Sequence, residues 1–193
     1  MSLPSRAVTM TKQMIQIEST DPGTYENTMA DWITSQLASY PNVQLTRQEV
    51  LPGRPNLMAE LTGDPSLPAL VMICHMDTVV VGDGWTLPPF AAIEKNGKIY
   101  GRGACDMKSG LACCLSAFQY AAEMLKASGK TPKQTLKLIC SMDEEDFMRG
   151  SEACIQSGWI TDHDWVIDAE PTNGQIQMAH KGRTWYEIDV QGH

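Results

Sequence analysis

Histidine, aspartate and glutamate side chains occur in this sequence where apolar segments run out into loops or turns. An imidazole and several carboxylates that meet in space can hold two divalent metal ions, and one more carboxylate can act as a general base. They can act together only if the fold brings these segment ends to one place. Six residues are candidates for such a centre: His75, Asp77, Asp106, Glu144, Glu145 and Glu170.

His75 and Asp77 follow an apolar segment at residues 69–74. That segment has no polar alternation, which is typical of a strand buried on both faces. Side chains two residues apart on an extended segment point to the same side. His75 can therefore bind a metal through one ring nitrogen while Asp77 fixes the other N–H or tunes the site.

Asp106 lies in a glycine-rich turn at residues 100–110, ahead of an apolar, helix-like stretch at 111–125. Glycine allows backbone geometry that residues with a Cβ atom resist. The turn can therefore aim the Asp106 carboxylate inward.

Two further strand-like segments end in carboxylates. Residues 136–142 lead into an acidic run that contains Glu144 and Glu145. Because these two are adjacent, they cannot point the same way from an extended strand, so one can bind metal while the other faces water. The next strand-like segment ends near Glu170, with Asp168 as the alternative on the same face.

Each of these patterns is weak alone, since an acidic run is more often a solvated loop than a metal site. Their conjunction is stronger evidence. Open α/β sheets place their sites at the carboxyl ends of strands. Imidazole and carboxylate together suit zinc, cobalt or manganese.

Four motifs, in order and spacing, resemble a known family. HMDTV is followed by Trp85 and Pro89-Phe90, then by GKIYGRGACDMKSG, SMDEED and AEPT. The pattern is similar to that of the dinuclear zinc peptidases and amidohydrolases, which include acetylornithine deacetylase, succinyl-diaminopimelate desuccinylase, glutamate carboxypeptidase and aminoacylase. The resemblance spans about residues 5–190.

The resemblance implies a cofactor of two divalent metal ions, with zinc expected and cobalt or manganese as alternatives. His75 and Glu170 would bind the first ion, and Glu145 would bind the second. Asp106 would bridge the two, which suits a carboxylate because it has two oxygens.

The resemblance also implies two catalytic residues, Glu144 as general base and Asp77 as the residue that orients His75. The expected reaction is hydrolysis of an amide bond in an N-acyl amino acid or small peptide. A dinuclear aminopeptidase or dipeptidase that acts on free α-amines is one alternative. A metal-binding domain without catalysis is another, although Glu144, which binds no metal in this scheme, argues against it.

Family members are usually longer, with a lid and dimerisation domain inserted after a strand like the one expected at residues 184–190. We therefore expect residues 1–193 to be the N-terminal part of the catalytic domain, without the lid and the C-terminal part. In the family, a histidine just inside the lid helps to polarise the substrate carbonyl. His193 is not expected to be that histidine. The full-length parent is expected to be a homodimer through the lid, and the chain alone is expected to be inactive.

Composition fits a globular enzyme of the cytoplasm. The net charge of −8 argues against nucleic acid or an anionic membrane as partner. The six cysteines show no paired CxxC spacing and are expected to be reduced core residues, with Cys105 as a possible exception. Lys181 and Arg183 offer charge for a substrate carboxylate, although lysine and arginine at a strand edge are more often solvated.

Alternating periodicities predict the elements that carry these residues. The fold class is α/β, a three-layer sandwich of helices around a mixed sheet. Asn96-Gly97 is typical of a hairpin turn. Helices are expected at residues 5–17, 25–39, 108–127 and 151–158, and strands near 43–50, 56–62, 69–75, 98–100, 135–142, 164–169, 175–180 and 184–190.

Overall fold

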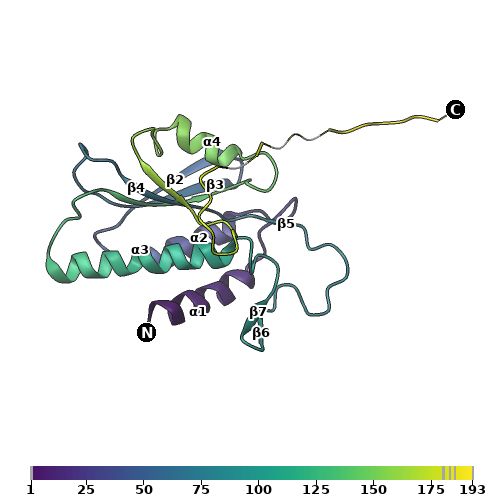
Figure 1. The fold of residues 1–193 in the computed structure, drawn as a ribbon, viewed down its shortest axis with the longest axis horizontal. Helices are drawn as coiled ribbons and strands as arrows, with labels where there is room; N and C mark the ends of the chain where they lie inside the picture. The colour runs from purple at the N-terminus through teal and green to yellow at the C-terminus, as the bar shows by residue number, and fades with distance from the viewer. Residues whose placement is uncertain (1, 180, 183, 185, 193) are drawn as a thin grey trace.

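The computed structural model describes residues 2–179, 181–182, 184 and 186–192. Its centre is a five-stranded mixed sheet with helices on both faces (Figure 1), so the predicted three-layer α/β sandwich is confirmed. The strand order is β2-β3-β8-β4-β9. These strands span Gln44–Leu51 (β2), Arg54–Leu61 (β3), Leu136–Ser141 (β8), Leu70–His75 (β4) and Trp165–Asp168 (β9).

Three neighbouring strands of this sheet run parallel. β4 pairs with β8 on one side and with β9 on the other, whereas β2 and β3 are antiparallel to their neighbours. The register places His75 opposite Ser141 and Ile73 opposite Asp168. The carboxyl ends of β4, β8 and β9 therefore meet at one edge of the sheet, and the candidate residues follow them there.

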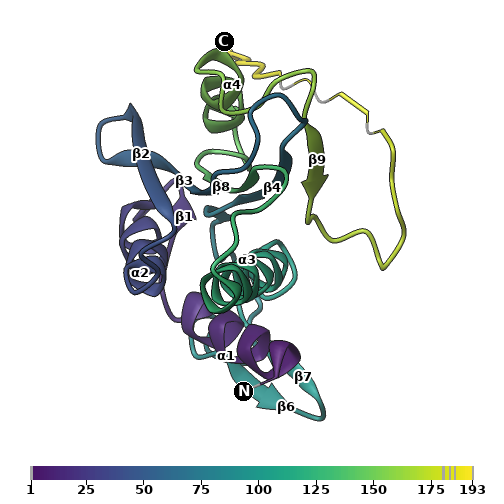
Figure 2. The same cartoon turned by 90° about the vertical axis from the view of Figure 1, so that its left-hand side faces the viewer.

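Helices α2 and α3 pack on one face of the sheet, α1 lies against α3 on that side, and α4 lies on the other face (Figure 2). All four predicted helices are present, with ends shifted by a few residues. The first begins early because Pro4 fits a first turn and the Ser2 hydroxyl accepts the Ser5 N–H at 3.4 Å. The helices span Leu3–Ile15 (α1), Asn27–Leu37 (α2), Lys108–Ser128 (α3) and Arg149–Gln156 (α4).

The larger hydrophobic core lies between the sheet and the three-helix face. Met14, Met29 and Phe118 are completely buried there. A smaller cluster under α4 contains Val71, Ile139 and Cys154. All six cysteines are free, as predicted, and four of them are buried. Cys105 and Cys113 are exposed, so the prediction of a core position is wrong for Cys113 as well as for the possible exception, Cys105.

Two short strand pairs complete the described structure. β6 (Ile93–Lys95) and β7 (Lys98–Tyr100) form the predicted hairpin, in which Asn96 and Gly97 have φ of 54° and 70°. Positive φ at both turn residues is what an Asn-Gly hairpin turn requires. β1 (Thr20–Asp21) pairs in parallel with β5 (Thr78–Val79), and neither was predicted because two residues carry no periodicity.

The strands predicted at 175–180 and 184–190 are wrong for the residues that the structure describes, none of which forms a strand there. Apolar residues at every second position, such as Tyr186, Ile188 and Val190, would give a strand one apolar face. A strand also needs partners for its backbone N–H and C=O groups. These side chains are 82–87% exposed. Arg183 and His193, to which the sequence also drew attention, lie outside the described residues.

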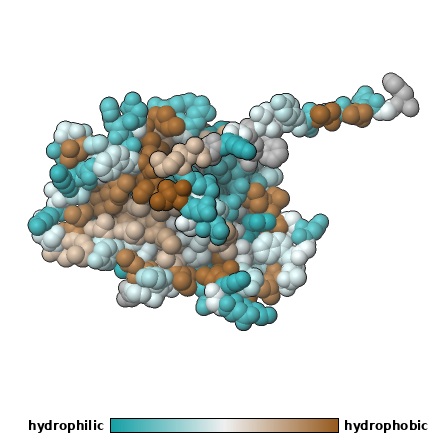
Figure 3. Space-filling model, viewed as in Figure 1, coloured by the Kyte–Doolittle hydropathy of each residue, from teal (hydrophilic) through white to brown (hydrophobic). Residues whose placement is uncertain are grey.

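Apolar surface is concentrated on β9, the edge strand next to this segment. Trp165, Val166 and Ile167 are 61%, 47% and 51% exposed. Figure 3 shows brown surface over this part of the molecule, and the chain beyond it runs away from the sheet. Among the described residues, no helix is long and apolar enough to cross a membrane.

Candidate metal centre

His75 is the buried base of the candidate site. It is the last residue of β4, and its side chain is 1% exposed. Its Nδ1 lies 2.9 Å from the backbone oxygen of Asp77. A carbonyl oxygen can only accept, so Nδ1 carries a proton and Nε2 is the ring nitrogen that can bind a metal.

Three carboxylates face that Nε2 atom. It lies 3.2 Å from Asp106 Oδ1, 3.5 Å from Glu170 Oε1 and 3.8 Å from Glu144 Oε2. Their side chains are 53%, 31% and 32% exposed. The imidazole therefore sits beneath carboxylates that solvent can reach, and Glu170 rather than Asp168 takes part in this group.

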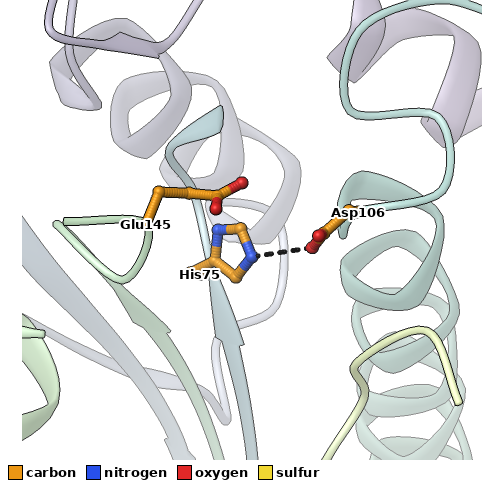
Figure 4. A group of neighbouring side chains, drawn as sticks. All are labelled: His75, Asp106 and Glu145. Carbon is orange, nitrogen blue, oxygen red and sulfur yellow. Dashed lines mark hydrogen bonds and ion pairs between the residues drawn. The ribbon is translucent and has the colours of Figure 1, made fainter. Parts of the chain in front are cut away.

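Figure 4 shows how three different elements contribute to the site: His75 from β4, Asp106 from the turn before α3, and Glu145 from the turn after β8. Donor atoms of these three residues lie within 4.8 Å of one another, and so do those of His75, Glu144 and Glu170. One imidazole nitrogen and several carboxylate oxygens form a donor set that fits zinc or a similar divalent ion.

Asp77 makes contacts beyond the one with His75 that the sequence indicated. Its carboxylate is completely buried and lies 3.4 Å from His75 Nδ1. It also accepts the backbone N–H groups of Glu144, at 3.2 Å, and of Glu145, at 3.0 Å. One carboxylate thus fixes both the imidazole and the turn that carries the two glutamates.

Electrostatics point to an excess of negative charge in this site. Burial opposes protonation of His75, but hydrogen bonds to Asp106 and Asp77 and the charge of Glu170 raise its pKa to about 11. Burial, together with the charges of Asp106 and other carboxylates, raises the pKa of Glu170 to about 8, although the charge of His75 acts to lower it. Burial likewise raises the pKa of Glu145. A divalent cation would relieve this repulsion by favouring the ionised carboxylates.

Lys108 holds the turn that carries Asp106, and the sequence analysis missed it. Its side chain is completely buried, and Nζ donates to the backbone oxygens of Met14, at 3.1 Å, and Ile17, at 2.7 Å. These carbonyls lie at the end of α1, so Lys108 ties the turn to that helix. A charged residue two positions after a candidate ligand, in a glycine-rich turn, was the available signal.

Asp143, the first residue of the acidic run, points away from the site. Its side chain is completely buried, and its two oxygens each lie 2.6 Å from a nitrogen of Arg149. Residues 143–146 are four consecutive acids, which would repel one another. Arg149 reduces this repulsion because it neutralises the first of them.

Gly150 allows α4 to pack closely against the end of β8. A Cβ atom there would lie 2.2 Å from Met142 O and 2.7 Å from Asn56 Oδ1. We expect Gly150→Ala to lower the free energy of unfolding by about 1–3 kcal/mol, the usual cost of overpacking. Urea denaturation measures this change. Gly182→Ala is the control, because a Cβ there would meet nothing within 4 Å; equal stability of the two variants would contradict the prediction.

Comparison with known proteins agrees with this geometry. Residues 71–190 match peptidase family M20/M25/M40, and the chain belongs to this family. It is 39% identical over 141 residues to a probable succinyl-diaminopimelate desuccinylase of Staphylococcus aureus strain Mu50, which covers 72% of this chain and 34% of the relative. The family suggested by the sequence motifs is thus confirmed.

Solved structures share the fold. An M20 family metallo-carboxypeptidase from Sulfolobus solfataricus superposes with a TM-score of 0.65 at 22% identity, over 84% of this chain and 37% of that one. A dinuclear metal-binding peptidase of the M20 family from Bacillus subtilis superposes with a TM-score of 0.60 at 17% identity, over 86% of this chain and 42% of that one. The chain spans about a third of the length of the curated relatives that it matches.

Proposed function

We propose that the protein to which this chain belongs is a metal-dependent hydrolase that cleaves the amide bond of an N-acyl amino acid or small peptide. The observation that carries the proposal is the buried imidazole of His75, whose Nε2 atom faces the carboxylates of Asp106, Glu144 and Glu170 at 3.2–3.8 Å. Family membership and the similarity to a probable desuccinylase support it.

Four side chains would hold two divalent ions: His75, Asp106, Glu145 and Glu170. Asp106 would be shared between the ions, because its carboxylate lies beside both His75 and Glu145. Bound divalent ions of this type supply Lewis-acid polarisation of an amide carbonyl and lower the pKa of water. Zinc fits the donor set, as do cobalt and manganese.

Glu144 would move the proton in the reaction. Its carboxylate is about one-third exposed and lies at the mouth of the site, 3.8 Å from His75 Nε2. From there it can accept a proton from water at a carboxylate oxygen and return it to the amine nitrogen as the amide bond breaks. Asp77 holds the Glu144 backbone and keeps the His75 proton on Nδ1.

A substrate panel tests the proposal on the full-length protein loaded with zinc or cobalt. We expect N-acetyl and N-succinyl amino acids to be hydrolysed and free dipeptides to be poor substrates, with release of the amine as the measurement. Preference for free dipeptides would favour a dipeptidase or aminopeptidase instead. Metal binding without turnover of any of these substrates would favour a non-catalytic domain.

A further inference from the structure

A buried cluster of charged residues lies next to the candidate site. Arg54, the first residue of β3, has a side chain only 8% exposed, and those of Glu26 and Asp143 are completely buried. Arg54 Nε lies 2.9 Å from Glu26 Oε2, and Nη2 lies 2.5 Å from Glu26 Oε1. The same Nη2 lies 2.5 Å from Asp21 Oδ2 and 3.3 Å from Asp143 Oδ1.

The carboxylates of this cluster also come close enough to one another to suggest a second metal site. Donor oxygens of Asp21, Asp143 and Asp146 lie within 4.8 Å, as do those of Asp21, Glu26 and Asp77. However, guanidinium groups already supply the positive charge, since Arg54 contacts Asp21 and Glu26 directly. A resident arginine, rather than a metal ion, therefore explains the cluster.

The cluster is joined to the turn that carries Glu144 and Glu145. Glu26 Oε1, which Arg54 contacts, accepts the backbone N–H of Asp143 at 3.2 Å. Asp143 has a φ of 62°, so the chain turns sharply at this residue. The next two N–H groups donate to Asp77.

The N–H before the turn is fixed as well, because Met142 donates to Asn56 Oδ1 at 3.0 Å. Four successive backbone N–H groups, those of residues 142–145, are thus held by side chains that are completely buried. Both carboxylate oxygens of Glu26 pair with Arg54, and a buried carboxylate is stabilised by such a paired charge. Arg54 provides that charge from a strand on the opposite side of β8 from β4.

We propose that Arg54, acting through Glu26, is a positioning residue that fixes the 142–145 turn so that Glu144 and Glu145 project beside His75. The inference rests on the proposed function of that site. Arg54 itself touches none of the candidate ligands and takes no part in proton transfer. Loss of Arg54 would leave Glu26 buried without its partner, and the turn would lose the contact that sets its direction.

The test uses the full-length protein with Arg54→Met and Glu26→Gln. Glu26→Gln keeps the shape of the side chain but removes its charge. At saturating zinc, we expect each substitution to lower kcat about 10- to 100-fold, the usual effect of residues that support a metal site indirectly, while KM stays within about twofold. In the cobalt-loaded protein the visible absorption spectrum should also change, because Glu145 moves with the turn. Arg54→Lys keeps the positive charge but not the planar pair of N–H donors. Its kcat should therefore lie between those of the wild type and Arg54→Met.

Arg47→Met is the matched control. Arg47 lies on β2 and forms an ion pair with Asp31 in which the two side chains are 37% and 59% exposed, and its loss should change neither kcat nor the cobalt spectrum. Unchanged kcat and spectrum in folded Arg54→Met and Glu26→Gln would overturn the inference. So would failure of both variants to fold, because the cluster would then serve stability alone. An inactive wild-type protein would instead refute the proposed function, which the substrate panel detects independently.

Discussion

Glu144→Ala in the full-length protein is expected to lower kcat by about two powers of ten or more while leaving the metal content nearly intact. General-base catalysis contributes rate enhancements on this scale. The carboxylate stands at the mouth of the site and is about one-third exposed, whereas the imidazole beneath it is buried. Steady-state kinetics and elemental analysis of the same preparation measure the two effects.

Glu152→Ala is the matched control, because Glu152 lies on α4 and its carboxylate accepts the exposed side-chain amide of Gln156 at 2.9 Å. It should retain full activity. The structure makes the metal measurement decisive, since Glu144 also has an oxygen within 4.8 Å of His75 and Glu170. If Glu144→Ala removes metal and Glu145→Ala does not, the two glutamates have exchanged roles.

The parallel strands that carry the site were predictable because their sequences are apolar on both faces. Residues 69–75, 135–142 and 164–169 were expected as strands, and β4, β8 and β9 occur there. Once three such strands lie parallel, their carboxyl ends must share an edge, which is why His75, Glu145 and Glu170 come together. Strand order itself depends on pairing between distant segments, and local periodicity does not encode it.

Alternation failed as a guide to residues 175–180 and 184–190. The apolar side chains there repeat at every second position, yet Ile176 and Met178 are 92% and 91% exposed. Alternation describes the face that a strand would bury, but the strand forms only where partner groups satisfy its backbone. The described part of the chain offers no such partner to these residues.

The support of the site was harder to predict than its ligands. Asp143 belongs to the same acidic run as Glu144 and Glu145, but its positive φ turns it toward Arg149 and Arg54. Lys108 and Arg54 were missed because a buried cation resembles a solvated one in sequence. Only the structure shows which carbonyls and carboxylates surround each of them.

Asp106→Ala is expected to remove both metal ions from the full-length protein. Asp106 Oδ1 lies 3.2 Å from His75 Nε2, and its carboxylate also belongs to the group that contains Glu145. A carboxylate can span two ions about 3.5–4 Å apart because it has two oxygens. Without Asp106, no carboxylate would bridge the two ions. Each ion would lose one ligand and a nearby negative charge.

Elemental analysis after dialysis against metal-free buffer measures the loss, and it reports binding whether or not a substrate is known. Asp162→Ala is the control, since the Asp162 side chain is 93% exposed in the loop before β9. That variant should keep the metal content of the wild type. Retention of one ion by Asp106→Ala would show that Asp106 binds a single metal, and retention of both would remove it from the ligand set, leaving His75, Glu145 and Glu170 to hold the ions without a bridge.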